Sequence, residues 1–181
     1  MTTDLSTYNN KWYNPGSLLK RACWFLVSGL FFRSGFFPFY GIKVSLLEIF
    51  GAKSGKGVVI KTGVTIKYPW LLKLGNHCWI GENVWIDNLA MVEIGNHVCI
   101  SQGALLLTGN HDYSKPAFDL MVKSIVLEDG VWIGAKAVVC PGVTCHSHAV
   151  LSVGSVATQS LEAYGVYQGN PCIKIKTREI L

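Results

Sequence analysis

One polar stretch, residues 108–116, holds the side chains best suited to chemistry, in the order Thr-Gly-Asn-His-Asp-Tyr-Ser-Lys-Pro. Its histidine, His111, is a natural general base because the ordinary pKa of histidine lies near neutral pH. The sequence leaves three roles open for the neighbouring Asp112, which could orient His111, bind substrate hydroxyls or cap the loop. We predict that His111 is a catalytic base.

The elements that must position this stretch are marked by aliphatic residues spaced by six. They are Leu74, Ile80, Ile86, Ile94, Ile100, Leu106, Leu127, Ile133, Val139, Cys145 and Leu151. A period of six is typical of hexapeptide repeats, in which six residues form one short strand and one corner of a parallel β-helix. Cys145 takes the place of an aliphatic residue in this series, so we expect it to be a small core residue.

The interruptions of the period define the organisation. Residues 74–77 align with residues 94–97, so one coil takes three hexads and a two-residue insertion. The insertions, around Pro69-Trp70 and Asn88-Leu89, should stack on one edge. The period stops after Leu106, and a long loop that leaves a rigid repeat is usually functional. We predict an all-β fold, with a β-helix over residues 51–163, an extended loop at 107–124 and a tail at 164–181.

Residues 1–50 precede the repeats and should form a helical, apolar cap. Helices are expected at Leu18–Phe32 and roughly Lys43–Phe50. The apolar run 22–32 is only about half as long as a membrane-spanning helix. Two roles are open for residues 18–50, and they can coexist: covering the exposed edge of the first coil, or resting on a membrane surface with Lys20, Arg21 and Arg33 toward the headgroups.

Composition narrows the class of partner. The chain has 181 residues, a formal net charge of +5 and no arginine-rich arm, so nucleic acid is not an expected partner. The six cysteines form no Cys-x-x-Cys pair and are expected to be reduced thiols. The N-terminus lacks a charged start followed by an apolar stretch and a cleavage site. We therefore expect a cytoplasmic protein, at the inner face of the membrane if residues 18–50 contact lipid.

Several local motifs carry a family resemblance over residues 45–178. They are Phe50-Gly51-Ala52-Lys53, Tyr68-Pro69-Trp70, Ile86-Asp87-Asn88-Leu89-Ala90, Ile100-Ser101-Gln102-Gly103-Ala104, Thr108-Gly109-Asn110-His111-Asp112-Tyr113, Val131-Trp132-Ile133-Gly134 and Gly169-Asn170-Pro171. With these, the chain resembles the hexapeptide-repeat acyltransferases, in particular the sugar O-acetyltransferases of the colanic acid biosynthesis group. The resemblance implies a left-handed β-helix, a homotrimer with active sites between subunits, and acetyl transfer from acetyl-CoA to a saccharide or lipid-linked saccharide in surface polysaccharide or glycolipid synthesis.

The resemblance also implies roles for individual residues. His111 would take the proton of the acceptor hydroxyl. The expected acceptor-site residues are Asp87, Asn88, Gln102, Asp112 and Trp132. For Asp87 and Asn88 the alternative is a hydrogen-bonded corner of the repeat, and for Trp132 the alternative is packing, because Trp79 and Trp85 occupy comparable places.

The coenzyme A groove should run along the later coils. The residues expected beside it are Gly134, Ala135, Val153, Thr158, Lys174 and Lys176. Ala135 departs from relatives that carry a serine there, so only a backbone N–H remains to help the oxyanion. Gln159 and Ile173 replace basic residues that often meet the cofactor phosphates, and Lys174 and Lys176 could compensate.

Other functions remain open on the sequence. The γ-class carbonic anhydrases share the fold but need a second histidine five residues after the first, where this chain has Pro116. His77 and His97 read as repeat corners, and we expect no metal. N-acetylation of an amino sugar or a xenobiotic is one alternative, and a non-catalytic structural β-helix is another.

Overall fold

A computed structural model of the chain describes residues 2–35, 37 and 39–180. The parts of the predicted 1–50 cap and 164–181 tail at residues 1, 36, 38 and 181 therefore lie outside the described residues. The N-terminal elements are η1 (Leu5–Thr7), α1 (Leu18–Val27), the π-helical turn η2 (Ser28–Arg33) and α2 (Tyr40–Ile49). Both expected helices are present, and the second begins three residues earlier than expected.

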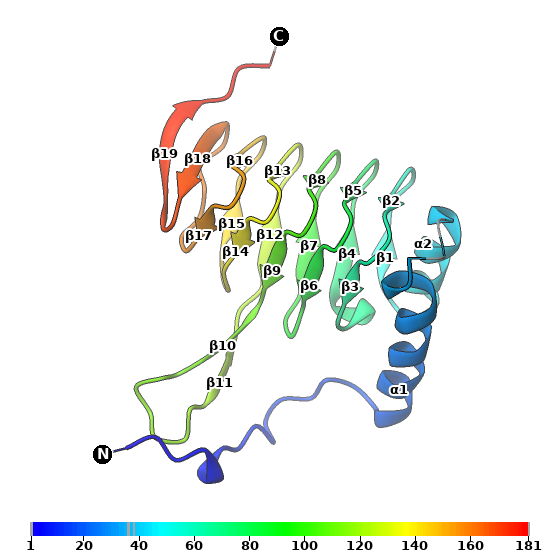
Figure 1. The fold of residues 1–181 in the computed structure, drawn as a ribbon, viewed down its shortest axis with the longest axis vertical. Coiled ribbons are helices and arrows are strands. Elements are labelled where there is room, and N and C mark those ends of the chain that lie inside the picture. Colours follow the sequence, from blue (N-terminus) through cyan, green and yellow to red (C-terminus); the bar gives the residue numbers. More distant parts are fainter. Residues whose placement is uncertain (1, 36, 38, 181) are drawn as a thin grey trace.

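Three sheets follow and wrap around one axis, and their strands are parallel except for the antiparallel pair β18 and β19 (Figure 1). Sheet A contains β1 (Lys53–Ser54), β4 (Leu72–Leu74), β7 (Val92–Ile94), β12 (Ile125–Leu127) and β15 (Thr144–Cys145). Sheet B contains β2 (Val59–Ile60), β5 (Trp79–Ile80), β8 (Cys99–Ile100), β13 (Trp132–Ile133), β16 (Val150–Leu151), β18 (Gly165–Gly169) and β19 (Cys172–Thr177). Sheet C contains β3 (Thr65–Ile66), β6 (Trp85–Asp87), β9 (Leu105–Leu107), β14 (Val138–Val139) and β17 (Val156–Ala157). The predicted left-handed parallel β-helix is confirmed.

The six-residue series forms the core of this prism. All eleven of its members are buried, from Leu74 at 5% exposure to Leu151 at 0%. Cys145 is fully buried among them as predicted, and burial raises its thiol pKa to about 12. The residue after each core position is often glycine because the next coil lies so close: a Cβ on Gly134 would sit 2.6 Å from the backbone nitrogen of Val153.

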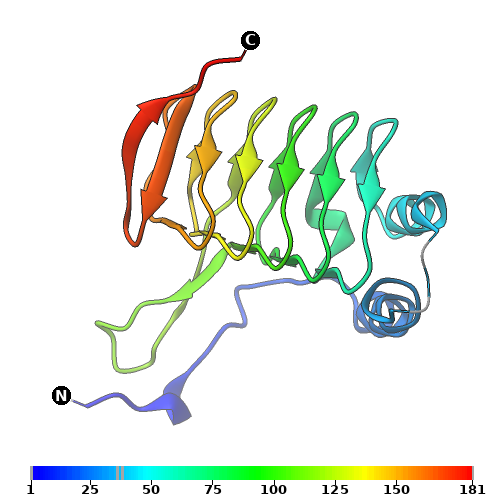
Figure 2. The same cartoon turned by 45° about the horizontal axis from the view of Figure 1, so that its top comes forward.

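The helices cover the open end of the first coil (Figure 2). Backbone carbonyls there lack a preceding coil, and side chains of the cap bond to them instead. The buried ammonium of Lys43 donates to the carbonyls of Ile60 and Lys61, and the indole of Trp24 donates to that of Ile66. The cap thereby protects the sheet edges, as one of the two roles predicted for residues 18–50 requires. None of the described helices has the length and apolar character needed to cross a membrane.

The interruption of the repeat and its C-terminal end both form hairpins. The insertion after β9 forms an antiparallel hairpin, β10 (Gly109–His111) and β11 (Leu120–Val122), which projects from the prism (Figures 1 and 2). The tail forms a second hairpin, β18 and β19, which pairs with β16 and closes the last coil. The tail is therefore part of sheet B rather than an appendage.

Candidate active site

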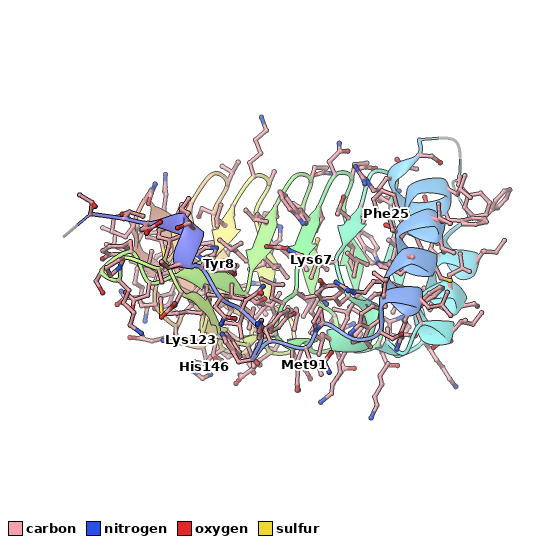
Figure 3. All side chains as sticks on the ribbon, turned by 90° about the horizontal axis from the view of Figure 1, so that it is seen from below. Tyr8, Phe25, Lys67, Met91, Lys123 and His146 are labelled. Carbon is pink, nitrogen blue, oxygen red and sulfur yellow. The ribbon has the colours of Figure 1, made fainter. Side chains whose placement is uncertain are left out.

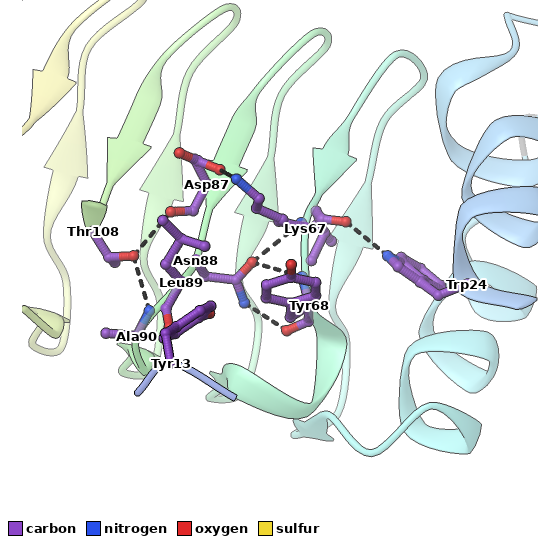
Figure 4. Close-up of polar contacts among 10 residues, drawn as sticks. Tyr13, Trp24, Lys67, Tyr68, Asp87, Asn88, Leu89, Ala90 and Thr108 are labelled. Atoms are coloured by element: carbon purple, nitrogen blue, oxygen red, sulfur yellow. Dashed lines mark hydrogen bonds and ion pairs between the residues drawn. The ribbon is translucent and has the colours of Figure 1, made fainter. Parts of the chain in front are cut away.

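The insertions do stack on one edge, the corner between sheets C and A. The first insertion is the turn η3 (Pro69–Leu71), and Asn88 of the second lies against it (Figure 4). The Asn88 amide oxygen accepts from the backbone N–H groups of Lys67 and Tyr68, and its nitrogen donates to the carbonyls of Tyr68 and Leu71. Asn88 is fully buried, and the backbone of the neighbouring coil uses both ends of its amide. This geometry favours the structural role of Asn88, so we do not include it in the acceptor site.

The carboxylate of Asp87 lies beside Asn88 on the same corner. It forms an ion pair with Lys67, with 2.8 Å between Oδ1 and Nζ (Figure 4). The Asp87 backbone carbonyl also accepts from the hydroxyl of Thr108, which in turn accepts from the Ala90 N–H. These contacts join the second insertion to the start of the third, which is the hairpin of His111.

The hairpin fixes the imidazole of His111 through two contacts with Phe118. The rings stack with centroids 4.5 Å apart and an interplanar angle of 11°, and Nδ1 lies 2.8 Å from the Phe118 backbone oxygen. A carbonyl oxygen only accepts hydrogen bonds, so Nδ1 carries the proton and Nε2 is left with a free lone pair. His111 is half-buried. This is the tautomer that a general base acting through Nε2 requires.

Asp112 does not contact the His111 ring in this arrangement. Its Oδ1 accepts from the backbone N–H and the hydroxyl of Ser114, and the hydroxyl bond is the main cause that lowers the Asp112 pKa. Lys115 lies 3.9 Å from the other oxygen. Of the three roles considered for Asp112, these contacts favour that of a loop cap.

A groove of about 1230 Å³ lies on the other side of the prism, over sheet B and the corner between sheets B and C. Its lining includes Gln102, Trp132, Gly134, Ala135, Val153 and Lys176, which were expected at the acceptor or cofactor sites. Trp132 is 47% exposed and its indole N–H donates to the hydroxyl of Ser101 at 2.9 Å. The sequence-predicted residues of the later coils are thus largely brought together.

Two neighbouring backbone N–H groups along this groove differ in whether they are free to bind a ligand. The Gly134 N–H donates to the Leu151 carbonyl, which leaves it unavailable to a ligand. The adjacent Ala135 N–H makes no hydrogen bond among the described residues and borders the groove. Ala135 can therefore offer a backbone donor to an oxyanion even though it lacks the hydroxyl of a serine.

Two expected cofactor residues, Lys174 and Thr158, are not part of this lining. Lys174 pairs with Glu162 at 2.6 Å, and this hydrogen bond raises the lysine pKa. The pairing of β18 with β19 shifts by one residue there, so Ile175 is an extra residue. This bulge breaks the alternation that would have put Lys174 and Lys176 on one face. Thr158 follows β17 and is exposed beyond sheet C.

Two features near these residues were not predicted from the sequence. Arg178 borders the groove beside Lys176, and its guanidinium donates to the carbonyls of Gly130 and His148. In the sequence, Arg178 is one of three basic residues close together near the C-terminus, with Lys174 and Lys176. The N-terminal arm, residues 2–17, runs along the prism to the hairpin, and Figure 3 labels its Tyr8. The ring centroid of Tyr8 lies 5.8 Å from that of His111.

His111 and the groove lie at different corners of the chain. The hairpin leaves the corner between sheets C and A, whereas the groove lies over sheet B and its corner with sheet C. Figures 1 and 2 show the hairpin pointing away from the prism. Among residues 2–35, 37 and 39–180 there is also no cluster of three or more His, Cys, Asp or Glu side chains suited to hold a metal ion.

Comparisons with known proteins agree with this architecture. No family model matches the chain. A protein of Escherichia coli K12 provisionally named as the colanic acid biosynthesis acetyltransferase WcaF is 36% identical, over 97% of each chain. The galactoside O-acetyltransferase of the same strain is 27% identical, over 74% of this chain and 68% of its own.

Solved structures give the same fold. A hexapeptide-repeat acetyltransferase of Vibrio cholerae has a TM-score of 0.78 and 25% identity, over 90% of this chain and 92% of its own. A galactoside acetyltransferase in complex with coenzyme A has a TM-score of 0.79 and 24% identity, over 89% and 82%. The chain belongs to the family of hexapeptide-repeat acetyltransferases, and it is an acyltransferase.

Proposed function

We propose that the protein transfers an acetyl group from acetyl-CoA to a hydroxyl of a saccharide, with His111 as the general base. The observation that carries the proposal is the bond between His111 Nδ1 and the Phe118 carbonyl, because it leaves Nε2 as the nitrogen with a free lone pair. The names of the similar proteins, which refer to colanic acid synthesis and to galactoside acetylation, support a sugar acceptor. The proposed acceptor is therefore a saccharide or a lipid-linked saccharide of surface polysaccharide or glycolipid synthesis.

The groove suits acetyl-CoA, whose thioester supplies the activated acetyl group. Apolar Trp132, Val153 and Ile175 can line the pantetheine arm, and the ammonium of Lys176 can meet a phosphate. His111 Nε2 takes the proton as the acceptor oxygen bonds to the carbonyl carbon. The Ala135 N–H can donate to the oxyanion that forms, and the proton then passes from Nε2 to the departing thiolate as the C–S bond breaks.

A homotrimer would bring the hairpin of His111 in one subunit next to the groove of another subunit. The outward residues of sheet A include Lys73 and Glu93, which pair at 2.8 Å and suit solvent. Sheets B and C instead present Trp79, Trp85 and Trp132, which are 62%, 49% and 47% exposed. Two apolar faces and one charged face on a prism favour a closed ring of copies. In such a ring the hairpin of one protomer can reach the groove of its neighbour.

Contact with a membrane is the second role proposed for residues 18–50. Leu18, Leu19, Phe25, Leu26 and Leu30 of α1 and η2 are each at least 64% exposed. Arg33 is exposed beside them, whereas the Lys20 ammonium lies over the Trp70 ring, 4.4 Å from its centroid. An apolar helix face with a basic residue at its end suits the surface of an anionic bilayer, where a lipid-linked acceptor would be found. Flotation with phosphatidylglycerol vesicles tests this, with Leu19→Ser and Leu26→Ser expected to abolish binding.

The experiment for the activity compares His111→Ala with His146→Ala. His146 is a surface histidine paired with Glu128 at 2.9 Å and serves as the matched control. His111→Ala should keep the trimer and the acetyl-CoA affinity but lower turnover by about 10²–10⁴-fold. Products from an oligosaccharide pool are identified by mass spectrometry. Near-normal turnover would exclude His111 as the base, N-acetylated products would favour the alternative reaction, and no acetyl-CoA binding would favour a structural module.

A further inference from the structure

The N-terminal arm is fastened to the catalytic hairpin of its own chain. The Asp4 N–H donates to the Pro116 carbonyl at the hairpin tip, at 2.9 Å. Asp4 also caps the short turn η1, because its side chain accepts from the Ser6 N–H at 3.0 Å. Terminal residues are usually ordered only when they are tied down. The turn and its bond to Pro116 therefore fix the position of the next residue, Tyr8.

A second fastening lies farther along the arm. The phenol of Tyr13 donates to the Leu89 carbonyl at 2.8 Å, beside the insertion corner (Figure 4). Burial raises the Tyr13 pKa, so the phenol stays protonated and keeps this bond. Gly16 then packs on Trp70, where a Cβ would lie 3.4 Å from the ring. The arm follows one path from the cap to the hairpin, as Figures 1 and 2 show.

Tyr8 stands where this path meets the catalytic histidine. Its ring centroid lies 5.8 Å from that of His111, with an interplanar angle of 54°. Phe118 already covers one face of the imidazole in a parallel stack, so Tyr8 forms a second, inclined aromatic surface at the base. Tyr8 is half-buried, and its phenol makes no hydrogen bond within the described part of the chain.

We propose that Tyr8 is a substrate-binding residue that forms the acceptor-side wall of the active site. A tyrosine offers an apolar ring and a polar tip, and a pyranose offers an apolar face edged by hydroxyls. The ring of Tyr8 would hold that face while the phenol bonds a neighbouring hydroxyl, which places the reacting hydroxyl at His111 Nε2. Because Asp4 bonds to Pro116, Tyr8 accompanies His111 wherever the hairpin reaches. The inference rests on the proposed function and adds the chemical class that the wall recognises, a pyranoside.

Kinetics of the full-length protein can test this role. The probes are methyl glucopyranoside, methyl galactopyranoside and methyl fucopyranoside, each titrated at saturating acetyl-CoA. Tyr8→Ala should raise the acceptor KM about tenfold and leave the KM for acetyl-CoA unchanged, and Tyr8→Phe should raise the acceptor KM only about threefold. The matched control is Trp12→Ala, which removes a 59% exposed aromatic ring from the same arm. Equal effects of Tyr8→Ala and Trp12→Ala, or an unchanged acceptor KM, would overturn the proposal.

A binding measurement separates this result from the outcome for His111. Saturation-transfer NMR reports the contact of the same glycosides with the protein in the absence of turnover. Transfer should be strong for the unmodified protein and for His111→Ala, and should be lost in Tyr8→Ala. Absence of transfer to all three glycosides in the unmodified protein, or equal transfer in Tyr8→Ala, would contradict the proposal that Tyr8 binds the acceptor. If Tyr8→Ala alone loses transfer while His111→Ala keeps full turnover, the wall stands and the assignment of the base fails.

Discussion

The imidazole Nδ1 of His111 lies 2.8 Å from the backbone oxygen of Phe118, the residue whose ring also stacks on it. One residue thus sets both the tautomer and the orientation of the base. Phe118 holds a positive φ of 52°, a left-handed conformation that is unfavourable for most residues with a side chain. This left-handed backbone conformation occurs at the residue whose carbonyl oxygen accepts the hydrogen bond from the imidazole.

Removing the Phe118 ring should loosen the base without removing it. Phe118→Ala keeps the carbonyl but loses the stack, and we expect kcat to fall about tenfold because a misplaced base transfers a proton less well. The KM for acetyl-CoA should not change, since Phe118 is not among the residues that line the groove. The control is Tyr113→Ala, a ring of the same hairpin that is 84% exposed. An equal loss of kcat in both variants would show that the Phe118 ring stabilises the hairpin but does not position the imidazole of His111.

The Trp132 indole should matter for acetyl-CoA affinity. Trp132→Ala is expected to raise the Kd for acetyl-CoA about tenfold, because the variant loses an aromatic surface of the groove and its bond to Ser101. Trp79→Ala is the control, since Trp79 lies on the same sheet outside the groove and is 62% exposed. Calorimetry gives the Kd, and light scattering verifies that both variants keep the mass of the unmodified protein. Equal Kd values for both variants would remove Trp132 from the site.

The repeat itself was predictable because its signal is local. A residue such as Ile86 is buried at 0% for the same reason that it recurs every six positions, and the loop of His111 stood out by breaking that period. The insertions at 69–71 and 88–90 were placed on one edge for the same reason.

Contacts that depend on the path of the chain could not be predicted in this way. Lys174 turns from the groove because of a one-residue shift between β18 and β19. Tyr8 lies near His111 although the two residues are far apart in the sequence, and Tyr8 lies outside the repeats, so their period gives no sign of this contact. Asn88 was recognisable as a corner residue, but its four hydrogen bonds to the preceding coil depend on how the coils stack in three dimensions.

The spacing between coils should make Gly134 intolerant of any side chain. A Cβ there would lie 2.6 Å from backbone nitrogen, and this overpacking should destabilise the fold by about 2 kcal/mol in Gly134→Ala. Gly41→Ala is the matched control, because nothing lies within 4 Å of its Cβ position and it belongs to α2. The control should be neutral or up to about 1 kcal/mol more stable. Thermal unfolding of both variants measures the difference, and similar melting temperatures would contradict the close approach.

Acid should weaken the corner between sheets A and B through Asp129. Its Oδ1 accepts from the Asn96 backbone N–H at 2.7 Å, and its two oxygens accept from the Asn96 amide at 3.2 and 3.1 Å. These hydrogen bonds lower the Asp129 pKa from its ordinary value of 3.8, and the bond from the Asn96 backbone N–H has the largest effect. The stabilisation from the carboxylate is therefore complete above the unfolded-state pKa and is lost as the pH falls through the lower, folded-state value.

Asp129→Asn should accordingly be less stable than the unmodified protein at neutral pH, and the gap should narrow between about pH 5 and pH 3. Glu179→Gln serves as the control, because Glu179 is exposed and makes no hydrogen bond or ion pair among the described residues. Melting temperatures measured in steps from pH 7 to pH 3 provide the readout. A gap that stays constant over this range would mean that the Asn96 bonds do not depend on the charge of Asp129.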